Sequence, residues 1–130
     1  MDAAGALSDL TEISSQVEAA VVLDAAGAVV ASTLDDAERT ARLARAALEL
    51  LDAADKRGQT GGRALTQLEA ALREGSVFVA RRDGRSIVAT TSAEPTSGLV
   101  FYDLKACLRS LPETPAKPKR RRTTKARADA

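Results

Sequence analysis

The segment that most restricts the fold is DDAERTARLARAALELLDAADKRG, residues 35–58, because its pattern matches a helix and no other structure. At about 100° per residue, its charged side chains gather in one narrow strip: Glu38, Arg42, Arg45, Glu49, Asp52 and Lys56. Nearly every other position is Ala or Leu, whereas a surface helix usually has an apolar stripe of only about 100° or slightly more. The apolar arc is therefore wider than one side of a core requires.

This arc divides into two neighbouring stripes. One consists of Leu43, Ala47, Leu50, Leu51 and Ala54, and the other of Ala37, Ala41, Ala44 and Leu48. A monomer that covered only the first stripe would leave the second one exposed to water. Because the second stripe has mostly small side chains, another helix could approach it closely, and we expect a second protein surface there.

Length and composition restrict the class of protein. The 130 residues suffice for one domain with one core, and 45% of them are hydrophobic although only Phe78, Phe101 and Tyr102 are aromatic. No apolar run approaches the roughly 18 residues of a membrane span, and the N-terminal MDAAGALSDL lacks the features of a signal peptide. We therefore expect a cytoplasmic, bacterial protein without a transmembrane segment; the excess of Arg over Lys before residue 112 suggests a bacterial source.

The residue types argue against catalysis and metal binding. The chain has no histidine, the commonest general base and metal ligand, and Cys107 is its only cysteine. The Gly-rich GQTGGRA, residues 58–64, lacks the Gly-Lys-Ser/Thr sequence that a phosphate-binding loop requires. Carboxylates at helix starts and in turns have structural explanations. We expect no enzymatic activity, no catalytic residue, no metal site and no cofactor.

Charge is unevenly distributed along the chain. Residues 1–111 carry 12 basic and 16 acidic side chains, a net charge of −4, whereas residues 112–130 carry seven basic and two acidic ones, a net charge of +5. Past Leu111 no large apolar residue is available to offset the entropy of ordering by burial. We therefore expect a folded domain over residues 1–111 and a disordered basic tail over residues 112–130. The basic residues of the tail are Lys117, Lys119, Arg120, Arg121, Arg122, Lys125 and Arg127.

The tail has several possible roles. It could act as a solubilising segment, or it could make weak electrostatic contact with nucleic acid, an anionic membrane or the acidic face of a protein. Since it contains no aromatic side chain to stack on bases, any contact with nucleic acid would be directed at phosphates and would not be specific for sequence.

Hydrophobic periodicity and turn signals predict the order of the elements. We expect a helix at 3–16, strands at 19–24 and 28–32, the long helix at 35–57, strands at 76–82 and 85–91, and a last helix from Thr96 or Ser97 to Leu111. For residues 64–73 the local pattern suits a helix and a strand equally well.

Turn and cap residues support these boundaries. Asp83-Gly84 between two β-rich runs is the strongest short-range signal for a hairpin, and Asp24 with Gly27 marks a second turn. Either Thr33 or Asp35 is expected to cap the long helix.

The order of these segments resembles the roadblock family, which includes dynein light chains and many small bacterial proteins. The likeness covers roughly residues 6–111, with AAVVLDAAGAVVAST before the long helix, GSVFVARRDGRSIVATTS after it and SGLVFYDL opening the last helix. The resemblance implies an α+β, profilin-like fold in which a five-stranded antiparallel sheet lies between helices, in the order α-β-β-α-β-β-β-α. Residues 64–73 would then form a strand.

The resemblance also implies a function. Roadblock proteins are partners of Ras-like small GTPases, as activators, regulators or scaffolds, and they typically pair through the long helix and the strand after it. The homodimer interface is then expected at Ala37, Ala41, Ala44, Leu48 and Leu51. The contact face for the GTPase is expected at Glu38, Arg42, Arg45, Glu49 and Asp52. The alternative is a nucleic-acid-binding protein that acts through its basic tail, while the folded domain only dimerises.

Overall fold

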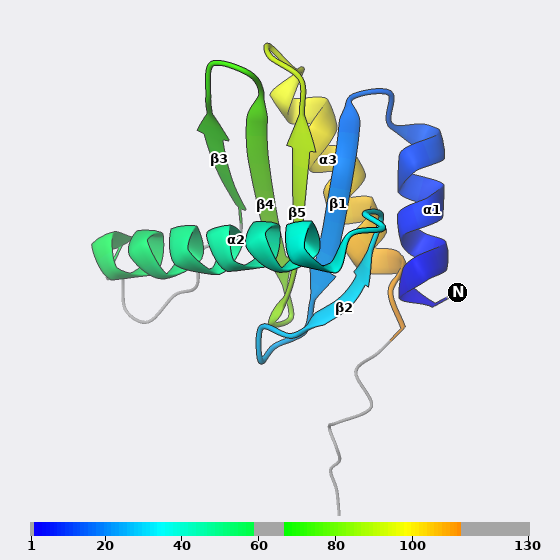
Figure 1. The fold of residues 1–130 in the computed structure, drawn as a ribbon, viewed down its shortest axis with the longest axis horizontal. Coiled ribbons are helices and arrows are strands. Elements are labelled where there is room, and N and C mark those ends of the chain that lie inside the picture. The colour runs from blue at the N-terminus through cyan, green and yellow to red at the C-terminus, as the bar shows by residue number, and fades with distance from the viewer. Residues whose placement is uncertain (1, 59–66, 113–130) are drawn as a thin grey trace, which may run out of the picture.

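The computed structural model describes residues 2–58 and 67–112 as one sheet with helices on both faces (Figure 1). The helices are α1 (Ala3–Ile13), α2 (Ala37–Gly58) and α3 (Ser97–Ser110), and the strands are β1 (Val17–Leu23), β2 (Val29–Ser32), β3 (Gln67–Ala71), β4 (Ser76–Arg82) and β5 (Arg85–Thr91). The expected α+β class and element order are confirmed, and within the 64–73 segment a strand forms over Gln67–Ala71. The predicted glycine-rich loop after α2 and the basic tail from residue 113 onward lie outside the described residues.

The strands form one antiparallel sheet in the order β2-β1-β5-β4-β3, so β2 and β3 are its edges. The pairing of β1 with β2 is irregular, with a register shift between Val22 and Leu23. The β4–β5 hairpin turns at Asp83 and Gly84, whose φ angles are 55° and 81°. Glycine adopts positive φ readily and aspartate tolerates it, which explains the hairpin signal in the sequence.

The β1–β2 turn also forms as predicted. The Asp24 carboxylate accepts hydrogen bonds from the backbone N–H groups of Ala26 and Ala28, both at 2.9 Å. Gly27 has a φ of 88°. Together these features reverse the chain between the two strands.

Gly75, just before β4, is required by close packing of the backbone. A Cβ atom at this position would lie 2.1 Å from the carbonyl oxygen of Thr91 at the end of β5. The N–H of Leu72 donates to the Gly75 carbonyl at 2.8 Å and closes the β3–β4 turn. The glycine that opens GSVFV therefore allows three strands to meet at this end of the sheet.

One face of the sheet is covered by α1 and α3, which pack side by side over a continuous core. Phe78 of β4 is fully buried there and meets the ring of Phe101 edge-on, with the ring centroids 5.0 Å apart. Cys107 is buried between the helices, and its thiol lies 3.6 Å from the carbonyl oxygen of Ala6. Large aliphatic residues complete the core: Leu7, Leu10, Val22, Ile87, Val100, Leu104 and Leu108.

Of the three described helices, α2 is the one that lies on the other face (Figure 1). Ala44, Ala47 and Leu51 pack against a patch of the sheet formed by Val21, Leu23, Val79 and Val88. The helix crosses the sheet and continues beyond β3, so it leaves part of this face without a helical cover (Figure 1). The ion pair between Arg81 of β4 and Asp55 of α2, with Nη2 and Oδ1 3.0 Å apart, ties the helix to the sheet near its overhanging end.

The start of α2 differs from the prediction. The Asp36 carboxylate accepts hydrogen bonds from the N–H groups of Glu38 and Arg39, at 2.8 and 3.3 Å, whereas Thr33 or Asp35 had been expected to cap the helix. The Thr33 hydroxyl instead accepts from the N–H of Ala20 in β1, at 2.9 Å. Three neighbouring side chains were chemically capable of capping, and pairing with β1 removes Thr33 from that role.

The first helix is shorter than expected, ending at Ile13 rather than at residue 16. The hydroxyl of Ser14 accepts hydrogen bonds from the N–H groups of Gln16 and Val17, both at 3.3 Å. This side chain turns the backbone out of the helix, and β1 consequently begins at Val17 rather than at residue 19. Among the described residues, no helix is both long and apolar enough to cross a lipid bilayer.

Candidate protein-binding site

The predicted partner-contact residues form one exposed strip on the side of α2 that faces away from the sheet. The strip consists of Glu38, Arg42, Arg45, Glu49 and Asp52. Asp52 pairs with Lys56 one turn later, at 3.2 Å, and both side chains remain well exposed. An exposed i,i+4 pair contributes only about 0.2–0.5 kcal/mol to the helix, so a partner could replace it at little cost. The strip is accessible, and its use as a contact face stays a prediction.

In the structure, the predicted dimer stripe consists of two buried and three exposed residues. Ala44 and Leu51 are only 6% and 4% exposed because they pack on the chain's own sheet. These two residues therefore contribute to the chain's own core rather than to an exposed stripe. Ala37, Ala41 and Leu48 remain exposed, and Leu48 lies beside the β1–β2 turn, 3.2 Å from the position that a Cβ atom on Gly27 would occupy.

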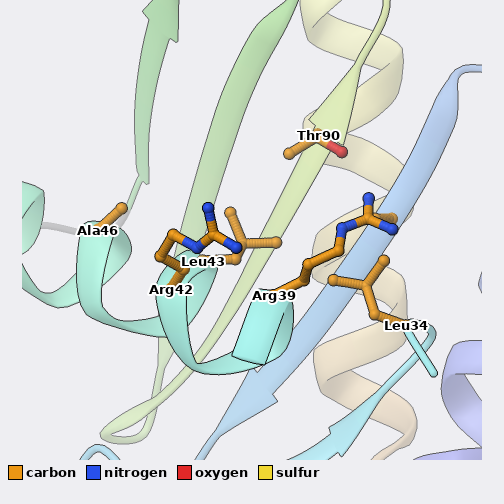
Figure 2. Close-up of a pocket in the computed structure, with 7 residues that line it drawn as sticks. Leu34, Arg39, Arg42, Leu43, Ala46 and Thr90 are labelled. Atoms are coloured by element: carbon orange, nitrogen blue, oxygen red, sulfur yellow. The ribbon is translucent and has the colours of Figure 1, made fainter. Parts of the chain in front are cut away.

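An open groove lies on the opposite side of α2, between the helix and the uncovered part of the sheet (Figure 2). Its volume is about 640 Å³. The β1 and β5 strands contribute Ala19 and Thr90 to its lining. The segment leading into α2, and α2 itself, contribute Leu34, Arg39, Arg42, Leu43 and Ala46. The groove thus joins the exposed strip to the bare surface of the sheet.

Sequence comparison identifies the family: a model of the Roadblock/LC7 domain matches residues 4–92. The chain belongs to the Roadblock/LC7 family. Among characterised proteins, no sequence matches this Roadblock/LC7 chain closely enough to support a comparison.

Solved structures share the fold of this Roadblock/LC7 chain. A Roadblock/LC7 domain from Streptomyces avermitilis superposes with a TM-score of 0.75 at 19% identity, covering 85% of this chain and 94% of that one. MglB from Myxococcus xanthus has a TM-score of 0.68 at 15% identity, covering 81% and 87%. A structure described as MglB with a tetrameric arrangement has a TM-score of 0.70 at 16% identity, covering 84% of each chain. At these identities the likeness concerns the fold.

Two arginines give the groove of this Roadblock/LC7 chain its chemical character. Arg39 and Arg42 extend over the groove from successive turns of α2 (Figure 2). Neither guanidinium forms an ion pair or a side-chain hydrogen bond with another residue in the described ranges. A planar guanidinium suits carboxylate and phosphate groups, to which it can donate two parallel hydrogen bonds. The groove therefore combines an apolar floor with a cationic rim.

The sequence pattern pointed to Arg42 and not to Arg39. The available signal was their spacing, because residues three apart lie on neighbouring parts of one helix surface. Arg39 had been overlooked since it falls outside the charged strip, on the flank of the apolar arc. In the described parts of the chain, no cluster of three or more acidic or cysteine side chains is arranged to hold a metal ion.

Proposed function

We propose that this Roadblock/LC7 chain is a homodimeric, non-enzymatic adaptor that binds a Ras-like small GTPase. The observation that carries the proposal is the incomplete cover of the sheet on its α2 face. One flank of α2 faces uncovered sheet across an open groove, and the end of the helix overhangs β3 (Figure 1). An incomplete apolar layer of this kind favours association with a second copy.

The position of β3 supports a specific arrangement of the two copies. β3 is an edge strand, and within residues 2–58 and 67–112 one of its sides has no neighbouring strand. Pairing of two β3 strands about a two-fold axis would continue the sheet from one copy into the other. The overhanging end of each α2 would then lie over the uncovered sheet of its partner. In this arrangement the dimer contacts come from Leu43, Ala46 and Leu50, on the groove side of α2, rather than from Ala37, Ala41 and Leu48.

The same arrangement supports a place for the GTPase. Two exposed strips, one from each α2, would lie next to each other on the outer surface of the dimer. Each strip mixes acidic and basic side chains, including Glu38, Arg45 and Glu49, which can match a polar protein surface with both signs of charge. Partnership with Ras-like GTPases is what the family resemblance implies. The absence of histidine and of a phosphate-binding loop in the sequence supports a non-enzymatic role.

The dimer is tested by placing one charge on either side of α2. Ala46→Glu places a carboxylate in the groove, whereas Ala41→Glu places it on the opposite flank, and both positions are exposed. Multi-angle light scattering should show wild type and Ala41→Glu as dimers and Ala46→Glu as a monomer, all with the same circular dichroism spectrum. The reverse result would return the interface to the Ala41 flank, and a monomeric wild type at micromolar concentration would refute the proposed dimer.

GTPase binding requires a separate test. The protein is mixed with the Ras-like GTPase encoded nearest to its gene, loaded with GDP or with a non-hydrolysable GTP analogue. Binding is expected for wild type and should be lost with Arg45→Glu, while Arg73→Glu, a control on the exposed β3–β4 turn, should bind normally. Both variants should remain dimers by light scattering. Binding in neither nucleotide state would refute the GTPase proposal, and GTP turnover by the protein alone would refute the non-enzymatic role.

The alternative function, binding of nucleic acid through the basic tail, stays a prediction, because the tail lies outside the described residues. It would be supported if the full chain bound DNA or RNA and a chain ending at Pro112 did not.

A further inference from the structure

A second groove lies on the opposite face of the molecule, between α1 and α3. Its volume is about 220 Å³. From α1 it is lined by Ala6, Asp9, Leu10 and Ile13, and from α3 by Asp103, Ala106, Cys107 and Ser110. The Roadblock/LC7 function proposed above makes no use of this site.

Asp103 is the unusual member of the groove. Its residue is only 8% exposed, and its carboxylate forms no hydrogen bond or ion pair with any residue of the described chain. Burying a charged group is costly unless the group is paired. Asp9 lies in the same lining and also lacks a cationic partner among the described residues. The described lining of the groove therefore has two carboxylates and no basic side chain to balance them.

The negative charge of Asp9 acts on the Cys107 thiol, which lines the same groove. Burial raises the pKa of the Cys107 thiol to about 11, and the negative charge of Asp9 adds to this shift. Apart from the carboxylates and Ser110 the lining is mainly apolar, with Leu10 buried and Ile13 73% exposed. An aliphatic stem that ends in a positive charge fits both features, since Lys and Arg side chains pack their stems on apolar surface and direct the charged end to a polar group.

The basic side chains of the tail follow the end of α3, close to the groove. Leu111 is buried, and the Arg85 guanidinium donates a hydrogen bond to the Pro112 carbonyl, so the point where the tail leaves the domain is fixed. Ser110 already belongs to the groove lining. Asp103 lies seven residues earlier in α3, about 10 Å along the helix at 1.5 Å per residue. Lys117 follows Pro112 by five residues, which can span up to about 17 Å.

We propose that the basic tail of this chain folds back into the groove between α1 and α3, where side chains from Lys117 onward pair with Asp103 and Asp9. The tail carries a net charge of +5 and the body of the chain −4, so the contact is complementary in charge as well as within reach. The bound tail would supply the partner that Asp103 lacks. Because part of the contact is exposed to solvent, salt would weaken it by screening.

The test measures the distance between tail and groove in the full-length chain. A nitroxide spin label is attached to Thr123→Cys, and the buried Cys107 thiol, with its raised pKa, remains unlabelled at neutral pH. At low salt the label should broaden the backbone amide resonances of Leu10 and Ala106. The broadening should diminish at high salt, and it should be lost in the double variant Asp9→Asn, Asp103→Asn.

A matched control distinguishes the loss of the groove carboxylates from a general change in net charge. The double variant Glu18→Gln, Glu74→Gln removes the same two charges at exposed positions outside the groove, and it should retain the broadening. Absence of broadening in wild type, or equal loss in both double variants, would overturn the proposal. In a second sample, isotope-labelled chains that lack the spin label are mixed with spin-labelled chains that lack the isotope. Broadening in this sample reports contact between copies. Broadening seen only in that mixture would assign the groove to the tail of a second copy and would also overturn the proposal.

Discussion

The two faces of the sheet differ in how completely the chain covers them. On one face α1 and α3 bury Phe78 and a set of large aliphatic side chains. On the other face α2 packs Ala44 and Ala47, together with Leu43 and Leu51, on the sheet. Hydrophobic stabilisation scales with buried apolar area, so the two alanines contribute less than Phe78 and the large aliphatic side chains of the first face. The comparison assigns most of the packing that stabilises the monomer to the first face, whereas the second is the face on which we propose that a second copy binds.

The largest expected effect comes from substituting neighbouring residues of β4 that point to opposite faces. Phe78→Ala should lower the free energy of unfolding by about 3–5 kcal/mol, because it removes a fully buried ring and leaves a cavity. Val79→Ala removes two methyl groups from the α2 face and should cost about 2 kcal/mol. Urea denaturation monitored by circular dichroism measures both values. Equal losses for the two variants would contradict the difference between the faces.

The next prediction concerns the close backbone contact between Gly75 and Thr91, which shapes the sheet that both faces share. Gly75→Ala should destabilise the fold by about 1–3 kcal/mol, because its Cβ atom would overlap the Thr91 carbonyl and force the backbone apart. Gly98→Ala is the matched control, since no atom lies within 4 Å of its Cβ position. This control should be neutral or stabilise α3 by up to about 1 kcal/mol. Similar thermal stability of the two variants would argue against a tight contact at Gly75.

A smaller effect is expected at the ion pair that ties α2 to β4. Asp55→Asn keeps the shape of the side chain and removes the charge that faces Arg81. Because Asp55 is 40% exposed, the loss should stay below about 1 kcal/mol. It should also shrink as salt is added, which a urea titration at two ionic strengths would detect. A salt-independent loss of several kcal/mol would mean that the α2 face relies on polar anchoring more than on packing.

An effect that is absent at neutral pH and appears only in alkaline solution concerns Cys107 in the well-covered face. Its pKa is raised from 9.0 to about 11 by burial and by Asp9, so the folded state holds the proton more tightly than the unfolded state. The resulting stability is fully present below pH 9 and is lost as the pH rises from 9 to 11. Melting temperatures of wild type should therefore fall more steeply over this range than those of Cys107→Ala. Parallel curves for the two proteins would show that the thiol does not titrate in this way.

Much of the fold was predictable because its signals are local. Asp83-Gly84 located the β4–β5 hairpin with its correct strand ends, and the turn chemistry of Asp24 and Gly27 located the first hairpin. The identity of β3 was not predictable from local pattern, since Gln67–Ala71 suits a helix as well as a strand. The family resemblance identified it as a strand. Its residues become a strand because they pair with β4, and such pairing is not encoded in periodicity.

The candidate sites were less predictable. The width of the apolar arc on α2 indicated two covered surfaces, but alanines on both flanks do not show which one faces the sheet. Ala44 and Leu51 were consequently placed at an outer interface although they belong to the core. Asp103 was overlooked entirely. A single acidic residue in an amphipathic helix is common, and the sequence does not reveal that the neighbouring side chains from α1 include no cation.

The unequal edges of the sheet determine how far assembly through strand pairing can proceed. At one edge β2 spans only four residues and its register with β1 is interrupted, which makes it a poor template for another strand. At the other edge β3 pairs regularly with β4 along its whole length. If two copies join through β3, the only regular edge of each is consumed and both outer edges are the irregular ones. Growth of the sheet would then end at two chains, because each outer edge is a poor template for a further strand.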